Sequence, residues 1–191
     1  RDGRSARQHG LRCGAVGVGC RSQRRRGRRS APEHLRPGDV AARSALGEPE
    51  FNPDTFQLQI DGLVANPLAI NWKDLQARPP VYSDTLIMYC VEGWEVWGNW
   101  KGLLIQDLLD QAQVQNEGKH VLFHCLDGYT TALPIAYLNK FQGMLAYEVN
   151  GKFLTQTDGF PLRVVAFGKF GYKWAKWITS IEVVDKEERG Y

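Results

Sequence analysis

The sequence predicts an α+β domain with a mixed β-sheet core and short helices. After residue 50, apolar segments of strand length separated by turn residues outnumber helical segments. Strands and helices do not alternate regularly, and no internal repeat is found, so a regular βαβ architecture is not expected. With 191 residues, the chain suits one domain with room for a core.

The first half of the predicted domain is defined by a strand period and a helix cap. Residues 55–61 alternate polar and apolar side chains, as a strand with one face on a core does. Asn71 precedes a short helical segment and is suited to accept hydrogen bonds from its free amide groups. We expect strands over residues 55–61, 68–70 and 81–90, and a helix over residues 72–77.

The second half combines an amphipathic helix with a hairpin signal. Leu104, Leu108 and Ala112 form one stripe of a helix predicted over residues 103–113. Asn150 and Gly151 separate two β-rich runs, which is the pattern of a tight β-hairpin. Further strands are expected over residues 120–125, 163–167 and 179–184.

Charge is divided unequally along the chain. Residues 1–47 contain twelve Arg against three acidic residues, a net charge of +9, whereas the other 144 residues carry twelve basic and eighteen acidic groups, a net charge of −6. The first segment has no aromatic residue, so it lacks the apolar area that would offset its ordering entropy. We therefore expect a disordered Arg-rich leader over residues 1–47 and one folded domain over residues 48–191.

The four cysteines have no spacing typical of a zinc site or a disulfide framework. Cys13, Cys20, Cys90 and Cys125 include no Cys-x-x-Cys pair. Cys125 is expected on a strand as a small buried side chain. Cys90 ends an apolar, strand-like run at a Gly-Trp turn, where a thiol can face a cavity and meet a soft metal. A buried structural Cys is the alternative interpretation.

Three further motifs follow Cys90. They are DGYTTALP at residues 127–134, GFPLR at residues 159–163 and GKFGYKWAKW at residues 168–177. In this order and spacing, Cys90 and the three motifs resemble the oxidoreductase molybdopterin-binding domain, the catalytic domain of the sulfite oxidase family. The resemblance runs from about residue 51 to about residue 185, and the bacterial stand-alone branch looks closest.

The resemblance implies a sulfite-oxidase-type molybdopterin-binding fold and a molybdenum–pyranopterin cofactor. In that family the metal has two dithiolene sulfurs, one protein thiolate and two oxo or hydroxo groups, and Cys90 stands at the position of the thiolate. One soft, anionic protein ligand then suffices, so Cys90 is the predicted catalytic and metal-binding residue. The residues that the resemblance places at cofactor-contacting positions are Asp127, Arg163, Lys173, Trp174 and Lys176, and the predicted site also includes Tyr129 and Lys169.

Side-chain chemistry agrees with these assignments. Three lysines near two glycines in residues 168–176 place positive charge beside exposed backbone amides, which is what capture of a phosphate needs. An ionised Asp127 can accept hydrogen bonds from pterin N–H groups. The alternatives are an ordinary surface turn for the lysines and a turn-capping role for Asp127.

Departures from the sulfite oxidases bear on the substrate. Asp158 stands where a His would match in their pocket for the sulfite anion, and Glu92 and Glu95 replace an Arg-rich continuation after the Cys. Glu92 and Glu95 would repel a small dianion. The nearby tryptophans, expected either to wall a pocket or to join the core, are Trp94, Trp97 and Trp100.

We predict a molybdopterin-dependent oxidoreductase that transfers an oxygen atom in a two-electron reaction on a small or sulfoxide-type substrate. A separate haem or flavin protein would exchange its electrons, because the chain has no recognisable haem motif or Cys cluster. The alternatives are a degenerate, non-catalytic binding module of the same fold and nucleic-acid binding through the leader. No nucleic acid is expected at the folded domain. No membrane span or signal peptide is recognisable, which leaves a cytoplasmic or periplasmic location open.

Overall fold

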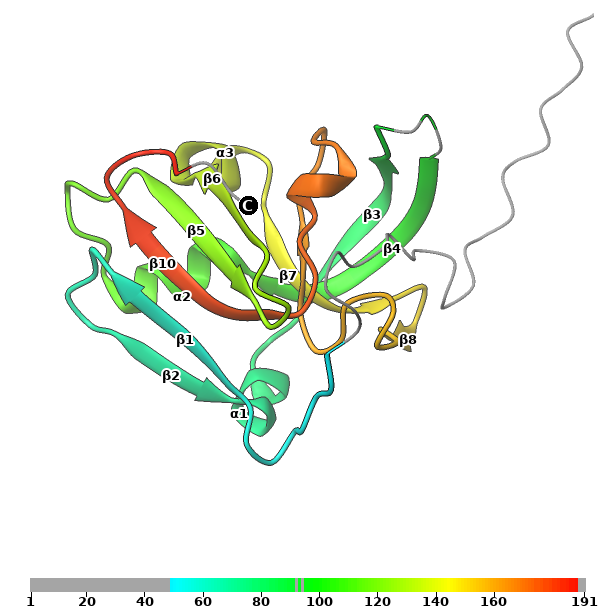
Figure 1. The fold of residues 1–191 in the computed structure, drawn as a ribbon, viewed down its shortest axis with the longest axis horizontal. Coiled ribbons are helices and arrows are strands. Elements are labelled where there is room, and N and C mark those ends of the chain that lie inside the picture. Colours follow the sequence, from blue (N-terminus) through cyan, green and yellow to red (C-terminus); the bar gives the residue numbers. More distant parts are fainter. Residues whose placement is uncertain (1–48, 92, 94, 189–191) are drawn as a thin grey trace, which may run out of the picture. The chain divides into compact units, whose positions relative to one another are not determined.

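The computed structural model describes residues 49–188, except Glu92 and Trp94. The leader predicted over residues 1–47 lies outside the described residues. Within the described part, ten strands form two sheets, with three short α-helices and one 3-10 turn between them (Figure 1). The predicted α+β class with a mixed sheet is confirmed.

The first sheet is mixed and has the strand order β2-β1-β10-β5-β6. Strand β1 runs parallel to β10, and the other neighbours are antiparallel. The fully buried Ile60 of β1 lies opposite the fully buried Ile181 of β10, so segments far apart in the sequence share one core. The strands are β1 (Gln57–Gly62), β2 (Leu68–Asn71), β5 (His120–Cys125), β6 (Thr130–Pro134) and β10 (Ile178–Val184).

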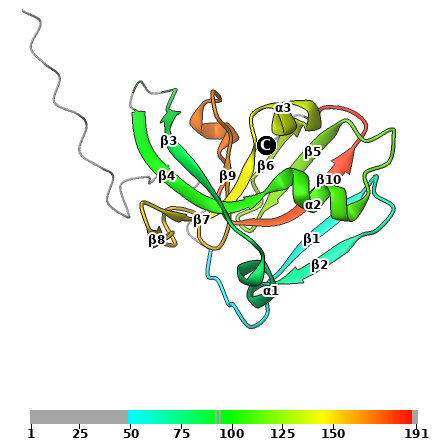
Figure 2. The same cartoon turned by 180° about the vertical axis from the view of Figure 1, so that it is seen from behind.

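Alternation along β1 decides which face of this sheet is buried. Leu58 and Ile60 are inaccessible to solvent, whereas Gln59 and Asp61 are exposed. Helix α2 (Ile105–Ala112) lies over the buried face (Figure 2). The predicted alternating strand is thus confirmed, although it begins two residues later than expected.

The second sheet is antiparallel and carries the end of β3, where Cys90 follows. Its strand order is β3-β4-β7-β8, and β9 also pairs with β7. Asn150 and Gly151, with φ angles of 52° and 76°, form the tight turn between β7 and β8, so the predicted hairpin is confirmed. The strands are β3 (Val81–Tyr89), β4 (Glu95–Leu104), β7 (Met144–Val149), β8 (Lys152–Phe153) and β9 (Arg163–Val165).

Local sequence signals predict the bounds of the first helix correctly and those of the second helix incorrectly. Helix α1 spans Trp72–Ala77, and the Asn71 side chain accepts a hydrogen bond from the Asp74 amide, as predicted. The helix predicted over residues 103–113 was placed too early. Its first two residues end β4, where Leu103 and Leu104 pair with β7, so Leu104 does not belong to the buried helical stripe. Sheet pairing overrides the helical period here.

Strand β4 was not predicted, nor were β6 and α3 (Ile135–Lys140). Glycines and Asn99 weaken the strand signal of β4, which is held by its neighbours β3 and β7 on either side. Trp97 and Trp100 are three positions apart in this strand and therefore point to opposite faces. Trp100 is buried in the core, which confirms the second of the two alternatives for this residue, and Trp94 lies outside the described residues.

At Gly102, the backbone of β4 lies close to that of β7. A Cβ atom there would overlap the carbonyl oxygen of Leu145 and lie 2.6 Å from the Cα atom of Ala146. Neither obstacle is a flexible side chain, so Gly102→Ala must displace a strand. We expect a loss of about 3 kcal/mol or more in the free energy of unfolding, measured by urea denaturation.

Gly151 provides the matched control. A Cβ atom there would have no neighbour within 4 Å, and only its φ of 76° opposes substitution. Gly151→Ala is therefore expected to lose roughly 1 kcal/mol. Equal losses in the two variants would contradict a steric role for Gly102.

Candidate active site

Cys90 follows β3 directly and is partly exposed. Its carbonyl oxygen accepts a hydrogen bond from the Gly93 amide at 3.1 Å, which closes the turn after the strand. Tyr89 pairs in parallel with Phe170, so the end of β3 lies beside the segment that follows β9 (Figure 1). Cys90 therefore follows the end of an edge strand of the second sheet, one residue after the pairing with the lysine-rich motif.

The turn between β5 and β6 is tied to the same region. The Tyr129 amide donates to the Asp127 carboxylate at 3.1 Å, a turn-capping bond, and Gly128 adopts a φ of 81°. The Tyr129 hydroxyl donates to the carbonyl oxygen of Tyr172 at 2.8 Å. Burial raises the pKa of Tyr129, which keeps this hydroxyl protonated as a donor.

The lysine-rich segment contains the 3-10 turn η1 (Gly171–Lys173). Lys169 places its ammonium group 4.8 Å from the centre of the Tyr137 ring, and Lys173 donates to the carbonyl oxygen of Ala132 at 2.9 Å. The pKa of Lys173 lies below its ordinary value because it is partly buried, and repulsion from Lys169 acts in the same direction, against the attraction of Glu187.

Three of the predicted site residues lie inside the protein. Arg163 is fully buried, Trp174 is 1% exposed and Lys176 is 9% exposed. The Lys176 ammonium group donates to the carbonyl oxygen of Thr157 at 3.0 Å and lies 4.2 Å from the centre of the Trp177 ring. We call these three residues the inner layer of the predicted site, and the partly exposed residues Cys90, Asp127, Tyr129, Lys169 and Lys173 its surface group.

Tryptophan contacts connect the inner layer to the surface group. The indole N–H of Trp174 donates to the carbonyl oxygen of Lys169 at 3.0 Å, and its ring lies 5.6 Å from that of Trp100. The guanidinium group of Arg163 lies 5.7 Å from the centre of the same Trp100 ring. All predicted site residues thus belong to neighbouring segments, although they are not on one surface.

Asp158, which replaces a His of the sulfite oxidases, is fully buried. Its carboxylate accepts hydrogen bonds from the Thr155 hydroxyl at 2.7 Å and from the Thr155 amide at 3.3 Å. The Asp158 amide in turn donates to the Thr155 hydroxyl oxygen at 3.2 Å. Asp158 therefore holds a turn closed inside the protein.

Met88 and Tyr172 contact predicted site residues but were not among them. Met88 accepts a hydrogen bond from Arg163, and Tyr172 accepts one from Tyr129. The position of Met88, two residues before Cys90, is the only sequence signal that would have pointed to it. Tyr172 lies inside the predicted motif, between Lys169 and Lys173, but its uncharged ring gives no sequence signal for a binding role.

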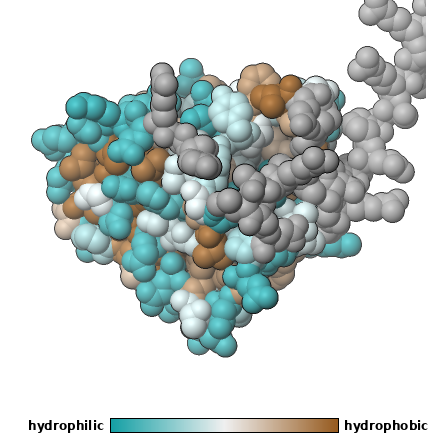
Figure 3. Space-filling model, viewed as in Figure 1, coloured by the Kyte–Doolittle hydropathy of each residue, from teal (hydrophilic) through white to brown (hydrophobic). Residues whose placement is uncertain are grey.

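Apolar side chains are exposed around Cys90. Figure 3 shows hydrophobic residues near the top of the view, in the area of the segment between β9 and η1. The rings of Phe170 and Tyr172 are stacked, with their centres 6.5 Å apart. The exposed side chains that form this apolar rim are Tyr89, Val91, Phe170 and Tyr172.

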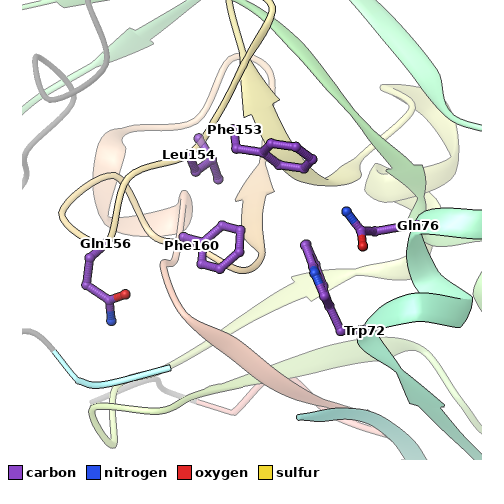
Figure 4. Close-up of a pocket in the computed structure, with 6 residues that line it drawn as sticks. All are labelled: Trp72, Gln76, Phe153, Leu154, Gln156 and Phe160. Atoms are coloured by element: carbon purple, nitrogen blue, oxygen red, sulfur yellow. The ribbon is translucent and has the colours of Figure 1, made fainter. Parts of the chain in front are cut away.

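A cavity of about 320 Å³ lies elsewhere, between α1 and the segment that leads to β9 (Figure 4). Aromatic rings of Trp72, Phe153 and Phe160 line it together with Gln76, Leu154 and Gln156. None of the predicted site residues is among these lining residues. The position of the cavity therefore gives no support to the predicted site.

Comparison with known proteins identifies the family. The chain matches the model of the oxidoreductase molybdopterin binding domain over residues 45–191. The uncharacterized oxidoreductase YuiH of Bacillus subtilis is 34% identical over 137 residues, which are 71% of this chain and 69% of YuiH. The putative protein-methionine-sulfoxide reductase subunit YedZ1 of Azospira oryzae is 32% identical over 142 residues, 74% of this chain and 54% of YedZ1.

The solved structures give the same answer for the fold. The sulfane dehydrogenase SoxCD from Paracoccus pantotrophus superposes with a TM-score of 0.69 at 25% identity, over 74% of this chain and 41% of that one. The class is thus that of molybdopterin oxidoreductases with a sulfite-oxidase-type fold. The chain belongs to the oxidoreductase molybdopterin-binding domain family.

These findings confirm the predicted family, the fold, the oxidoreductase class and the molybdenum–molybdopterin cofactor. The chain spans about half the length of YedZ1 and less of the SoxCD chain, so substrates and partners of the whole protein are proposals. The assignment of individual residues to the cofactor stays a prediction. No helix among residues 49–188, with Glu92 and Trp94 left out, is long and apolar enough to cross a membrane.

Proposed function

We propose that the protein is a molybdopterin-dependent oxidoreductase that transfers an oxygen atom in a two-electron reaction, with Cys90 as the molybdenum ligand. The observation that supports this most is the partial exposure of Cys90 beside the Lys169–Lys173 segment, which the pairing of Tyr89 with Phe170 brings about. A thiol that served only the core would be expected to be buried, as Cys125 is. We place the domain at residues 48–191.

The donor groups fit the cofactor. Cys90 offers one soft ligand, and the positive charges of Lys169 and Lys173 suit a bound anion such as the pterin phosphate. Asp127 and Tyr129 are proposed to contact the pterin ring edge. Arg163, Trp174 and Lys176 remain predicted cofactor residues, and their burial favours a role behind the contacting side chains. When bound, the cofactor supplies the two-electron chemistry, and the protein supplies orientation and access.

A neutral, sulfoxide-type substrate suits the surroundings of Cys90 better than a small dianion. Asp158 carries a carboxylate where a sulfite pocket would need a neutral or positive group, and it is occupied with Thr155. The exposed side chain of Glu95 adds negative charge near the end of β3, where β4 begins. The apolar rim offers contact surface for a substrate of low polarity.

A haem or flavin protein is proposed as the redox partner. The relative YedZ1 is named as a subunit, so that protein works within an assembly. The exposed rings of the apolar rim lie beside Cys90, where a partner would have to approach.

The alternative is a non-catalytic binding module of the same fold. The cavity favours it, because its lining contains none of the predicted cofactor residues. Metal analysis separates the two functions.

We expect the full chain, purified from a host with ample molybdenum, to contain about one molybdenum atom per chain, because the motifs describe a single pterin site. Inductively coupled plasma mass spectrometry measures this content. A known molybdoenzyme prepared in the same host is the control. If the control enzyme contains molybdenum and this chain does not, the non-catalytic binding module is the better-supported function.

A further inference from the structure

Arg163 is a cation buried without any exposed surface. One guanidinium nitrogen, Nη1, donates to the carbonyl oxygen of Asp158 at 2.9 Å, and the other, Nη2, donates to the sulfur of Met88 at 3.1 Å. Burial lowers the pKa of Arg163 to about 10, against the attraction of Asp158. Burying a charge costs free energy unless hydrogen-bonding partners compensate for the lost water. The Arg163 contacts should therefore tolerate little displacement.

The partners of Arg163 belong to three separate segments. Met88 is in β3, two residues before Cys90, and is fully buried. Asp158 lies in the turn that Thr155 closes, and Trp100, whose ring faces the guanidinium group, is in β4. Arg163 therefore connects the last buried residue before Cys90 to both the neighbouring strand and the turn before β9.

The position of Cys90 depends on this end of β3. After Met88, the side chains of Tyr89 and Val91 are exposed, so Met88 is the last side chain before Cys90 that is packed in the core, and beyond it the backbone is held by the strand pairing of Tyr89. A metal held by a single protein ligand is located, relative to the protein, by that one thiolate. Whatever anchors Met88 thus limits where the thiol can lie.

We propose that Arg163 is a positioning residue for Cys90 and acts through the sulfur of Met88. This role rests on the proposed function of Cys90 as the molybdenum ligand. The proposal implies that the two methionines of the chain have different roles. Met88 accepts a hydrogen bond from the guanidinium group, whereas Met144, 4% exposed in β7, is a core side chain.

The test compares Met88→Leu with the matched control Met144→Leu. Leucine keeps nearly the same volume in both variants, but it removes a hydrogen-bond acceptor that the structure shows for Met88 and does not show for Met144. The alkylation rate of Cys90 by iodoacetamide is measured in the full, metal-free chain carrying Cys13→Ser and Cys20→Ser. A Cys90→Ser variant gives the background rate from the buried Cys125. Melting temperature and molybdenum content are recorded for the same variants.

We expect Met88→Leu to raise the alkylation rate of Cys90 by about tenfold, the size that corresponds to loss of one hydrogen bond to a charged group. Its molybdenum content should fall, whereas Met144→Leu should change neither quantity at a similar melting temperature. Arg163→Met should repeat the result if it folds. Equal alkylation rates in the two leucine variants would overturn the proposal. If the wild-type chain contains no molybdenum, only the proposed role of Cys90 as the metal ligand is refuted. The alkylation rates still test whether Arg163 and Met88 position Cys90.

Discussion

Replacing Cys90 by Ser is expected to abolish molybdenum-dependent turnover and to remove the bound metal. The change exchanges a soft thiolate for a hard oxygen donor, so molybdenum affinity should fall by more than the roughly 10–100-fold typical of groups that only orient a ligand. The melting temperature should change little, because Cys90 is partly exposed after the end of β3. Metal content and turnover with a sulfoxide substrate are the measurements.

Cys125→Ser is the matched control in the same chain. Cys125 ends β5 at 7% exposure, and burial raises the pKa of its thiol, with Asp127 adding to the shift. A serine hydroxyl there loses its water contacts and should lower the free energy of unfolding by about 1–3 kcal/mol. Molybdenum per folded chain should stay at the wild-type level. Similar metal loss in both variants would mean that Cys90 is not the ligand.

Short-range patterns were sufficient for the elements that they encode. The Asn71 cap and the Asn150–Gly151 turn each depend on one or two residues, and both occur where the sequence predicts them. Strand β4 depends instead on pairing with β3 and β7, and its glycines carry no strand preference of their own. The parallel pairing of β1 with β10 likewise has no local signature.

The same distinction separates the surface of the site from its interior. Cys90 and the lysine-rich motif could be recognised in the sequence, because residue types and their spacing indicate the chemistry. The burial of Arg163 was not, since the acceptor Met88 is 75 positions away in the sequence. The residue type of Arg163 indicates a charge that needs partners, but only the fold shows which internal groups it contacts.

Trp174 joins the core to the lysine-rich segment, so its replacement should have a large effect on stability. Trp174→Ala removes a ring that is 1% exposed and packs against Trp100. We expect a loss of about 3–5 kcal/mol in the free energy of unfolding, measured by urea denaturation. Such a loss alone would show only that Trp174 belongs to the core.

Trp174→Phe isolates the link to the site, because it keeps an aromatic ring and removes the hydrogen bond to the Lys169 carbonyl oxygen. Its matched control is Trp177→Phe, which removes a hydrogen bond to the Gln156 carbonyl oxygen from an equally buried ring and keeps an aromatic ring beside Lys176. Each should lose about 1 kcal/mol of stability. Only Trp174→Phe should also lower the molybdenum content, because the segment it releases carries Lys169 and Lys173. If both variants kept the metal equally well, the indole hydrogen bond of Trp174 would serve the core and not the cofactor.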